Sequence, residues 1–190
     1  EGESLVLVTR LGNVKRVQRA DLAGSSGGFA EVIGLQGEAD EVLGAAFVSD
    51  KATVLIATAG NEKAPARALR FGVDAVNPQS SSSARGVTAI RAIAGDPPVG
   101  VAFAEPDAGS GKGGGLQVVA VTAGGQGKRM ALDGFPVQGR AGKGVQVWKV
   151  TQGSGPVAGI ALAGEGDTVD LLLADGTSIP VAVKDLASRS

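Results

Sequence analysis

Residues 118–129 read Val-Val-Ala-Val-Thr-Ala-Gly-Gly-Gln-Gly-Lys-Arg: a short apolar run, a glycine turn and a pair of cations. Short Val-rich runs bounded by glycine are typical of β-strands, so this stretch predicts a β-hairpin. A related order, in which a basic or apolar run follows the glycine turn, returns three more times, at 5–16, at 54–60 leading to 69–71, and at 169–179. Self-similarity at a period of roughly 50 residues is typical of a propeller or array built from one supersecondary unit.

Each full copy holds four short β-type segments separated by glycine, proline or acidic turns. In the first copy these segments are 5–9, 14–17, 29–35 and 42–48. No segment carries a long helical apolar stripe. We therefore predict an all-β, propeller-like array of four-stranded blades with about four repeats, the last one incomplete. The array forms a single domain over residues 1–190. Its blades span approximately 1–50, 51–115, 116–166 and, in part, 167–190.

The composition excludes several kinds of chemistry. The chain has no histidine, no cysteine and no tyrosine. Without cysteine there is no disulfide framework or thiolate metal site, and without histidine the commonest general base and metal ligand is missing. No carboxylate pair stands in a recognisable catalytic constellation, and no serine has a base to activate it. We therefore predict no catalytic residue and no metal site. No apolar run approaches the roughly 20 residues of a membrane helix, so no membrane partner is expected.

Residues 109–113, Gly-Ser-Gly-Lys-Gly, match a phosphate-binding loop only in part. A phosphate-binding loop needs Ser or Thr after the lysine and a helix after the loop. Here Lys112 is followed by glycine and then by a predicted strand, so we reject this interpretation.

The charges are segregated along the chain, although their sum is only −1. Cations follow the glycine turn in three of the four copies, whereas acidic residues gather elsewhere, as at 38–41. Scattered solvated charges would not favour one turn in several copies. We therefore expect a cationic track along one rim of the array. The residues expected on it are Arg10, Lys15, Arg16, Arg70, Arg85, Lys128, Arg129, Gln138, Arg140 and Lys143.

The segment 138–145, Gln-Gly-Arg-Ala-Gly-Lys-Gly-Val, places two long cations among glycines just before a predicted strand. Glycines let backbone N–H groups approach a polyanion, the planar guanidinium of Arg140 fits phosphate oxygens, and Lys143 adds a point charge. Alone, the segment reads better as a flexible connection with solvated charges. A cation pair at 128–129 precedes it, and its tail recurs at 85–87, which favours phosphate binding.

The order Gly-x-Gly-Lys-Arg at 125–129 and Gln-x-Arg-x-Gly-Lys-Gly-Val at 138–145 resembles a known family. It is similar to the C-terminal domain repeats of the A subunit of bacterial type IIA topoisomerases, DNA gyrase and topoisomerase IV. Residues 5–48, 54–104 and 117–163 all match that repeat. The resemblance implies a β-pinwheel, a propeller-like disc whose neighbouring blades share strands.

The resemblance also implies a function. Such a domain is not an enzyme by itself; it binds double-stranded DNA, bends or wraps it around a basic rim, and presents the bent DNA for strand passage. The catalytic tyrosine of the family lies in an upstream domain, and this chain has no tyrosine. The implied partners are the ATPase B subunit and the rest of the A subunit. No cofactor is expected here, since ATP and magnesium belong to other parts of the holoenzyme. The implied location is cytoplasmic and chromosome-associated.

The chain departs from the gyrase pattern in one motif. The gyrase A subunit carries its wrapping box, Gln-Arg-Arg-Gly-Gly-Lys-Gly, in the first blade, whereas the related segment here, 138–144, is degenerate and lies in the third copy. The sequence therefore does not separate gyrase from topoisomerase IV. The alternative interpretation is a propeller-like protein-interaction scaffold without DNA binding, which the near-zero net charge and the acidic stretches favour.

Overall fold

The computed structural model describes residues 3–22, 30–91, 93–108 and 115–188. In these residues the backbone forms four β-sheets joined by turns, loops and short 3-10 elements, with no α-helix. The predicted all-β pinwheel with an incomplete last repeat is thereby confirmed. The strands are β1 Glu3–Thr9, β2 Asn13–Gln18, β3 Val42–Ser49, β4 Thr53–Thr58, β5 Ala66–Gly72, β6 Val87–Thr88, β7 Pro98–Ala104, β8 Gln117–Thr122, β9 Gly127–Ala131, β10 Val145–Trp148, β11 Val157–Ala163, β12 Thr168–Leu172, β13 Ser178–Ala182 and β14 Ala187–Ser188. The 3-10 elements are η1 Arg19–Leu22, η2 Val73–Ala75, η3 Leu132–Gly134 and η4 Val183–Asp185.

The sheets share strands between neighbouring copies of the repeat. Their orders are β3-β1-β2-β6, β10-β5-β4-β7, β11-β8-β9-β14 and β12-β13. Each of the first three sheets is built on a hairpin flanked by an inner strand of its own copy, namely β3, β7 or β11. The outer strand comes from further along the chain, so that β6 of the second copy joins the first sheet and β10 of the third copy joins the second.

The hairpins end in the same way because a threonine stands at the same place in three of them. The Oγ1 atoms of Thr9, Thr58 and Thr122 accept hydrogen bonds from backbone N–H groups at the start of the returning strand. A hydroxyl that satisfies a turn amide favours a turn over continued strand. In the fourth hairpin the corresponding residue is Leu173, and the turn is held by Asp175, which accepts from the N–H of Thr177.

Apolar side chains fill the space between successive sheets. One buried cluster joins the first and second sheets and includes Val14, Leu69 and Phe71. Another joins the second and third sheets and includes Ala68 and Val118. Because side chains alternate along a strand, Leu69 and Phe71 of β5 face one neighbour and Ala68 faces the other. The second sheet is therefore covered on both sides, which explains why residues 54–57 of β4 form a continuous apolar run.

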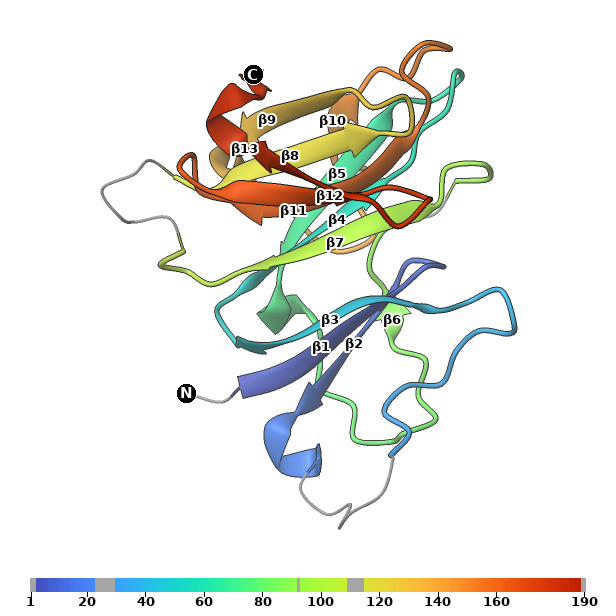
Figure 1. The fold of residues 1–190 in the computed structure, drawn as a ribbon. Coiled ribbons are helices and arrows are strands. Elements are labelled where there is room, and N and C mark those ends of the chain that lie inside the picture. Colours follow the sequence, from blue (N-terminus) through green and yellow to red (C-terminus); the bar gives the residue numbers. More distant parts are fainter. Residues whose placement is uncertain (1–2, 23–29, 92, 109–114, 189–190) are drawn as a thin grey trace.

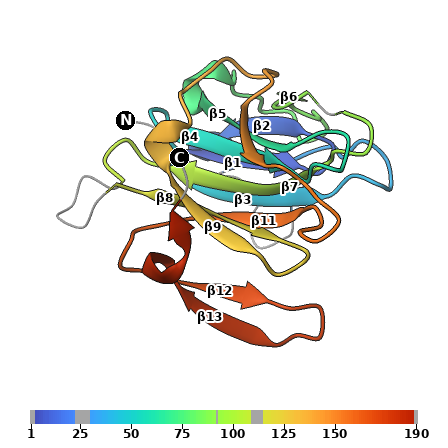
Figure 2. The ribbon, with the colours of Figure 1, turned by 90° about the horizontal axis from the view of Figure 1, so that it is seen from above.

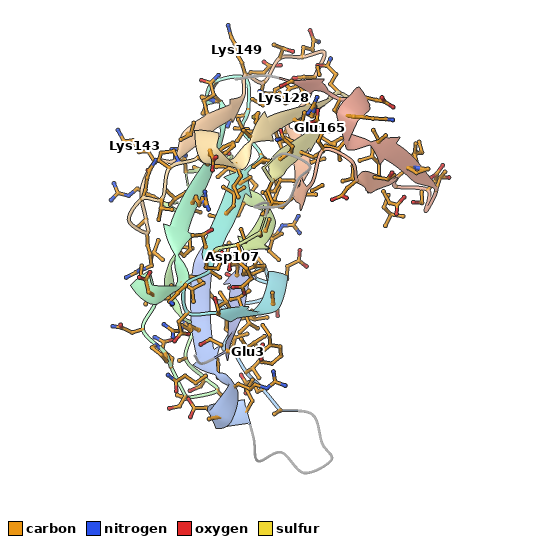
Figure 3. The ribbon with its side chains drawn as sticks, turned by 90° about the vertical axis from the view of Figure 1, so that its left-hand side faces the viewer. Glu3, Asp107, Lys128, Lys143, Lys149 and Glu165 are labelled. Carbon is orange, nitrogen blue, oxygen red and sulfur yellow. The ribbon has the colours of Figure 1, made fainter. Side chains whose placement is uncertain are left out.

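The sheets follow one another along an open arc. Figure 1 shows the inner strands β3, β7 and β11 in a row, and these strands pack against each other in that order. In Figure 2 the β12–β13 hairpin lies beside β11 at one end of the array. Figure 3 shows the curvature from the side, from the first sheet at the bottom to the fourth hairpin at the upper right.

Two expected strands differ from the structure. Residues 30–35 of the expected strand 29–35 have no strand conformation, while Phe29 lies outside the described residues. In the other copies the third β-type segment pairs with the preceding hairpin, and the described residues contain no hairpin before β1–β2 for 29–35 to join. The segment expected to begin at Arg85 pairs only at Val87 and Thr88. The loop containing Lys112 also lies outside the described residues.

Candidate nucleic-acid interface

The outer strands β6 and β10 begin in the same way. Gly86 and Gly144 stand directly before them with φ of +80° and +70°. A Cβ at Gly86 would lie 2.3 Å from the carbonyl oxygen of Val14, and one at Gly144 would lie 2.4 Å from that of Ala68. Glycine at these two positions therefore lets the segment before each outer strand lie directly against the edge of the hairpin. The preceding residues, the predicted Arg85 and Lys143, are both exposed.

The same strands are followed by cations that the sequence reasoning missed. Arg91 lies four residues after Val87, and Lys149 lies four residues after Val145; both are exposed. In Figure 3, Lys143 and Lys149 lie on the outer side of the arc and point away from it. Each outer strand is thus bracketed by two exposed cations, which we call the rim pairs, Arg85/Arg91 and Lys143/Lys149. Within the described residues, no rim-pair side chain makes a hydrogen bond or ion pair. The shared spacing of the two pairs was the available sequence signal.

Arg140 joins the two outer strands rather than standing free. Its Nε donates to the carbonyl of Ala75 in η2 at 2.9 Å, and its NH1 donates to the carbonyl of Thr88 in β6 at 2.8 Å. The next residue, Ala141, has φ of +58°, and its N–H donates to the carbonyl of Ala89 at 2.7 Å. The connector between β9 and β10 is therefore fastened against β6, which makes the two rim pairs parts of one continuous rim.

A buried carboxylate holds the other side of this connector. Asp96 is fully buried and accepts from the N–H of Gly60 at 2.6 Å and from Arg67 NH2 at 3.3 Å. Arg67 NH1 in turn donates to the carbonyl of Lys143 at 3.1 Å. Gln138 lies at the start of the connector and contributes its backbone N–H, which donates to the carbonyl of Arg70 at 2.8 Å. The main chain of Gln138 thus has a structural contact, and its role in DNA binding stays a prediction.

Three predicted site residues are equivalent positions of the three larger hairpins. Arg16, Arg70 and Arg129 pair across their hairpins with Val6, Leu55 and Val119. Their side chains are largely committed to the protein. Arg16 donates to Ser4 Oγ at 3.0 Å and to the carbonyl of Val76 at 3.3 Å, and its NH2 lies 2.5 Å from a carboxylate oxygen of Asp50. Arg70 donates to Thr53 Oγ1 at 3.0 Å. Arg129 donates to the carbonyl of Leu186 at 3.2 Å and pairs with Glu165 at 2.7 Å.

Two predicted lysines likewise occupy equivalent positions. Lys15 and Lys128 pair with Leu7 and Ala120. Lys15 is only 1% exposed, and its Nζ donates to the carbonyl of Ser81 at 2.6 Å. Burial lowers the pKa of Lys15, and the charge of Glu31 opposes part of that shift. The Nζ of Lys128 lies 5.2 Å from the centre of the Trp148 ring, within the range of a cation–π contact.

Arg10 is exposed in the turn after β1, where it pairs with Glu41. The structure therefore brings Arg85, Arg140 and Lys143 to one rim and adds Arg91 and Lys149. It turns Lys15 and Arg16 inward, because the second sheet covers one face of their hairpin and non-local loops, including Ser81, cover the other. Among the described residues no group of histidine, cysteine or acidic side chains could hold a metal, and none of the helices there could cross a membrane.

Comparisons with known proteins point to one family. The family model described as the DNA gyrase C-terminal domain, beta-propeller, matches residues 3–28 and 117–163. The chain is 31% identical over 192 residues to the A subunit of DNA gyrase from Dehalogenimonas lykanthroporepellens, covering 97% of the chain and 21% of that protein. It is 28% identical over 187 residues to the A subunit of DNA gyrase from Salmonella typhimurium, covering 98% of the chain and 20% of that protein. The chain thus spans about a fifth of the length of these relatives.

Solved structures agree on the fold. The crystal structure of the C-terminal domain of DNA topoisomerase IV superposes with a TM-score of 0.82 at 20% identity, covering 98% of this chain and 54% of that one. The DNA gyrase A C-terminal domain gives a TM-score of 0.76 at 20% identity, covering 99% and 58%. The fold is that of a propeller-like domain with shared strands. The chain belongs to the family of C-terminal domains of the A subunit of type IIA topoisomerases, as the sequence resemblance implied.

Proposed function

We propose that this domain binds double-stranded DNA along the rim formed by β6 and β10. The observation that carries the proposal is the repetition of the rim pairs: Arg85/Arg91 and Lys143/Lys149 bracket equivalent strands in successive sheets. Cations at matching places on neighbouring sheets would follow the sugar–phosphate backbone rather than read bases, so binding is expected to be weakly sequence-specific. Arg10 would not belong to this main track, because Glu41 offsets its positive charge.

Arg140 and Arg67 act on the DNA indirectly in this proposal. Their hydrogen bonds fix the connector that carries Lys143, so the rim is shaped before DNA arrives. A preformed rim avoids the free-energy cost of ordering a flexible connector when DNA binds. Because the sheets follow an arc, DNA that stays in contact with successive sheets has to bend. Smooth bending of a 20–30 base-pair site costs on the order of 1–6 kcal/mol, which the phosphate contacts must offset.

We further propose that the domain is not a catalyst by itself. Its place would be in the A subunit of gyrase or topoisomerase IV, where it would present bent DNA for strand passage and so influence DNA topology. The ATPase B subunit and the remainder of the A subunit would be its protein partners, and ATP and magnesium would act elsewhere in the holoenzyme. A cytoplasmic, chromosome-associated location would follow. This proposal rests on the family to which the chain belongs.

The test is a titration of a duplex of about 40 base pairs at two salt concentrations. Four neutralised phosphates predict that affinity falls on the order of a hundredfold between 50 and 200 mM salt. The double variant Lys143→Ala with Lys149→Ala should bind more weakly and show a shallower salt dependence, since two phosphate contacts are removed. Lys184→Ala is the matched control, because Lys184 is exposed but lies in η4, outside β6 and β10.

Two outcomes would contradict the proposal. An absence of binding at low salt would leave the protein-interaction scaffold as the better interpretation. Binding that weakens equally in the double variant and in Lys184→Ala would show that affinity depends on the total charge of the domain and not on the rim pairs. Circular dichroism of each variant would verify that the fold is retained.

A further inference from the structure

Lys15 is a predicted DNA contact that the fold buries. Its residue is only 1% exposed, so its ammonium group cannot reach the phosphates of a bound duplex. The Nζ of Lys15 instead donates to the carbonyl of Ser81 at 2.6 Å and lies 3.4 Å from the carbonyl oxygen of Ser82. A buried ammonium group needs hydrogen-bond partners to offset its lost hydration. These two main-chain carbonyls therefore fix the position of the lysine, and the lysine in turn fixes theirs.

The carbonyl of Ser81 belongs to the turn that leads directly to Arg85 of the rim. It accepts a second hydrogen bond, from the N–H of Ala84 at 3.2 Å, which closes the turn 81–84. A carbonyl oxygen has two lone pairs, so one serves the turn and the other serves Lys15. Arg85 is the next residue of the chain and is exposed. Lys15 thus holds the turn from which this rim cation extends.

Main-chain contacts fasten the segment on either side of this turn. The N–H of Gln79 donates to the carbonyl of Arg16 at 2.8 Å, and the N–H of Gly34 donates to the carbonyl of Ala84 at 3.2 Å. A Cβ at Gly34 would lie 2.3 Å from the carbonyl oxygen of Ser83, so the two segments are in close contact. The backbone is therefore held before and after the turn, and the lysine ammonium ties the turn itself to β2.

The second rim pair is carried in a comparable way. Arg67 of β5 donates from NH1 to the carbonyl of Lys143 at 3.1 Å, and its side chain is 14% exposed. In both sheets a shielded cation on the second strand of the hairpin donates to a main-chain carbonyl of the segment before the outer strand. The position of Lys15 corresponds to Leu69 in β5, not to Arg67, because Lys15 and Leu69 each precede the equivalent arginine of their strand. The likeness thus lies in the contact and not in the repeat of the sequence.

We propose that Lys15 is a positioning residue for DNA binding, which fixes the turn 81–84 and so holds Arg85 in line with the rim. The proposal rests on the proposed function of the rim and adds the residue that orders one of its cations. An Arg85 whose segment is already ordered contacts a phosphate without the loss of chain freedom that a loose segment would suffer, which raises affinity. The alternative is that the buried charge of Lys15 attracts DNA at a distance, and such a field acts whether or not Arg85 is present.

The first experiment is a double-mutant cycle in affinity for a duplex of about 40 base pairs at about 50 mM salt. Lys15→Met keeps an unbranched side chain and removes the ammonium group. The equivalent position of β5 holds the fully buried Leu69, so an apolar side chain is compatible with the fold there. We expect Lys15→Met and Arg85→Ala each to weaken binding about threefold, and the double variant to bind no more weakly than Arg85→Ala. Lys15→Met combined with Lys143→Ala should instead show the product of the two single effects.

The second experiment does not involve DNA. Trypsin cleaves after Arg85 and after Lys143, which are both followed by glycine, and the rate of cleavage reports how often each segment opens. We expect Lys15→Met to speed cleavage after Arg85 by about tenfold and to leave cleavage after Lys143 unchanged, as quantified by mass spectrometry of the first fragments. Lys184→Met is the matched control, because it removes a lysine charge in η4, away from the turn, and should alter neither rate.

The possible outcomes separate this role from the proposed function. A double variant equal to Arg85→Ala, together with cleavage that is faster only after Arg85, supports the positioning role. Independent effects of Lys15→Met and Arg85→Ala would overturn it in favour of a long-range field, while the rim would remain the DNA site. Equal changes in cleavage at the two sites, or no change at either, would also overturn it, because the lysine would then not act on the turn in particular. Absence of DNA binding by the unchanged protein at low salt would overturn the proposed function and this role with it.

Discussion

At the scale of single residues, the sequence indicated which side chains carry charge but not which way each one faces. Arg85 and Lys143 could be picked out because each precedes a glycine and a β-type segment, and both are exposed. Lys15 and Arg16 look similar in the sequence, yet they are buried. They are neighbours on one strand and point to opposite faces, and both faces of their hairpin are covered, one of them by a non-local loop.

Gly144 offers a direct test of how the connector is held. Its φ of +70° and the 2.4 Å that would separate a Cβ there from the carbonyl oxygen of Ala68 disfavour any side chain. The left-handed conformation alone costs an L-residue roughly 1–2 kcal/mol. We therefore expect Gly144→Ala to lower the free energy of unfolding by about 2 kcal/mol or more. Gly139→Ala in the same connector should change it little, because its Cβ would meet nothing within 4 Å. Urea denaturation of both variants measures the difference, and equal stabilities would contradict this account.

Lys15 predicts a pH dependence of stability. Burial lowers its pKa in the folded protein below the ordinary value of 10.5. The unfolded chain then binds the proton more tightly than the folded one, so stability from this group rises with pH. The rise should occur between the lowered folded pKa and 10.5 and should be absent well below that window. Urea unfolding at a series of alkaline pH values should show it in the native protein and not in Lys15→Met, and parallel curves for the two proteins would refute it.

At the scale of elements, the hairpins were predictable because their signals are local. The apolar run, the threonine and the glycine turn lie within one stretch of sequence, and all four hairpins form where they were expected. The third segment of each copy was less predictable, since its conformation depends on a hairpin in another copy. Residues 87–88 pair with β2, whereas 30–35 have no such partner among the described residues.

The same reasoning predicts uneven stability among the hairpins. A two-stranded sheet is at best marginally stable by itself, and β12–β13 is covered mainly on its β11 side. We expect amides shared between β12 and β13, such as that of Leu171, to exchange with solvent at least a hundredfold faster than that of Ile56 in the buried β4–β5 pair. Native-state hydrogen exchange measures both residues in one sample. Equal protection of the two would mean that the whole array opens as one unit.

At the scale of the whole molecule, the net charge of −1 is a poor guide to function. The acidic side chains offset internal arginines in several places, as Asp50 does for Arg16 and Asp96 does for Arg67. The rim pairs are left without such partners among the described residues. Neither the total charge nor its order in the sequence reveals this division, because it depends on which loops the fold brings beside each arginine.

The open arc predicts bending of bound DNA. A duplex of about 40 base pairs labelled at both ends should show increased energy transfer on adding the domain at about 50 mM salt, as the ends approach. At about 200 mM salt the increase should largely disappear together with the phosphate contacts. Arg140→Ala should reduce the bend more than it reduces affinity, because the arginine fastens the connector to β6 through Thr88. Saturated binding with no change in energy transfer would mean that DNA meets only one sheet.

Because β6 of the second copy pairs in the first sheet and β10 of the third copy pairs in the second, the boundaries of the sequence repeat do not coincide with those of the folded sheet. Residues of the first sheet run from β1 to β6 and those of the second from β4 to β10, so their spans overlap and no single scission releases one sheet whole. An in-frame duplication of one repeat, by contrast, copies both a hairpin and the outer strand that pairs with the preceding hairpin. Such an event lengthens the array by one unit, and every sheet inside the array keeps its outer strand.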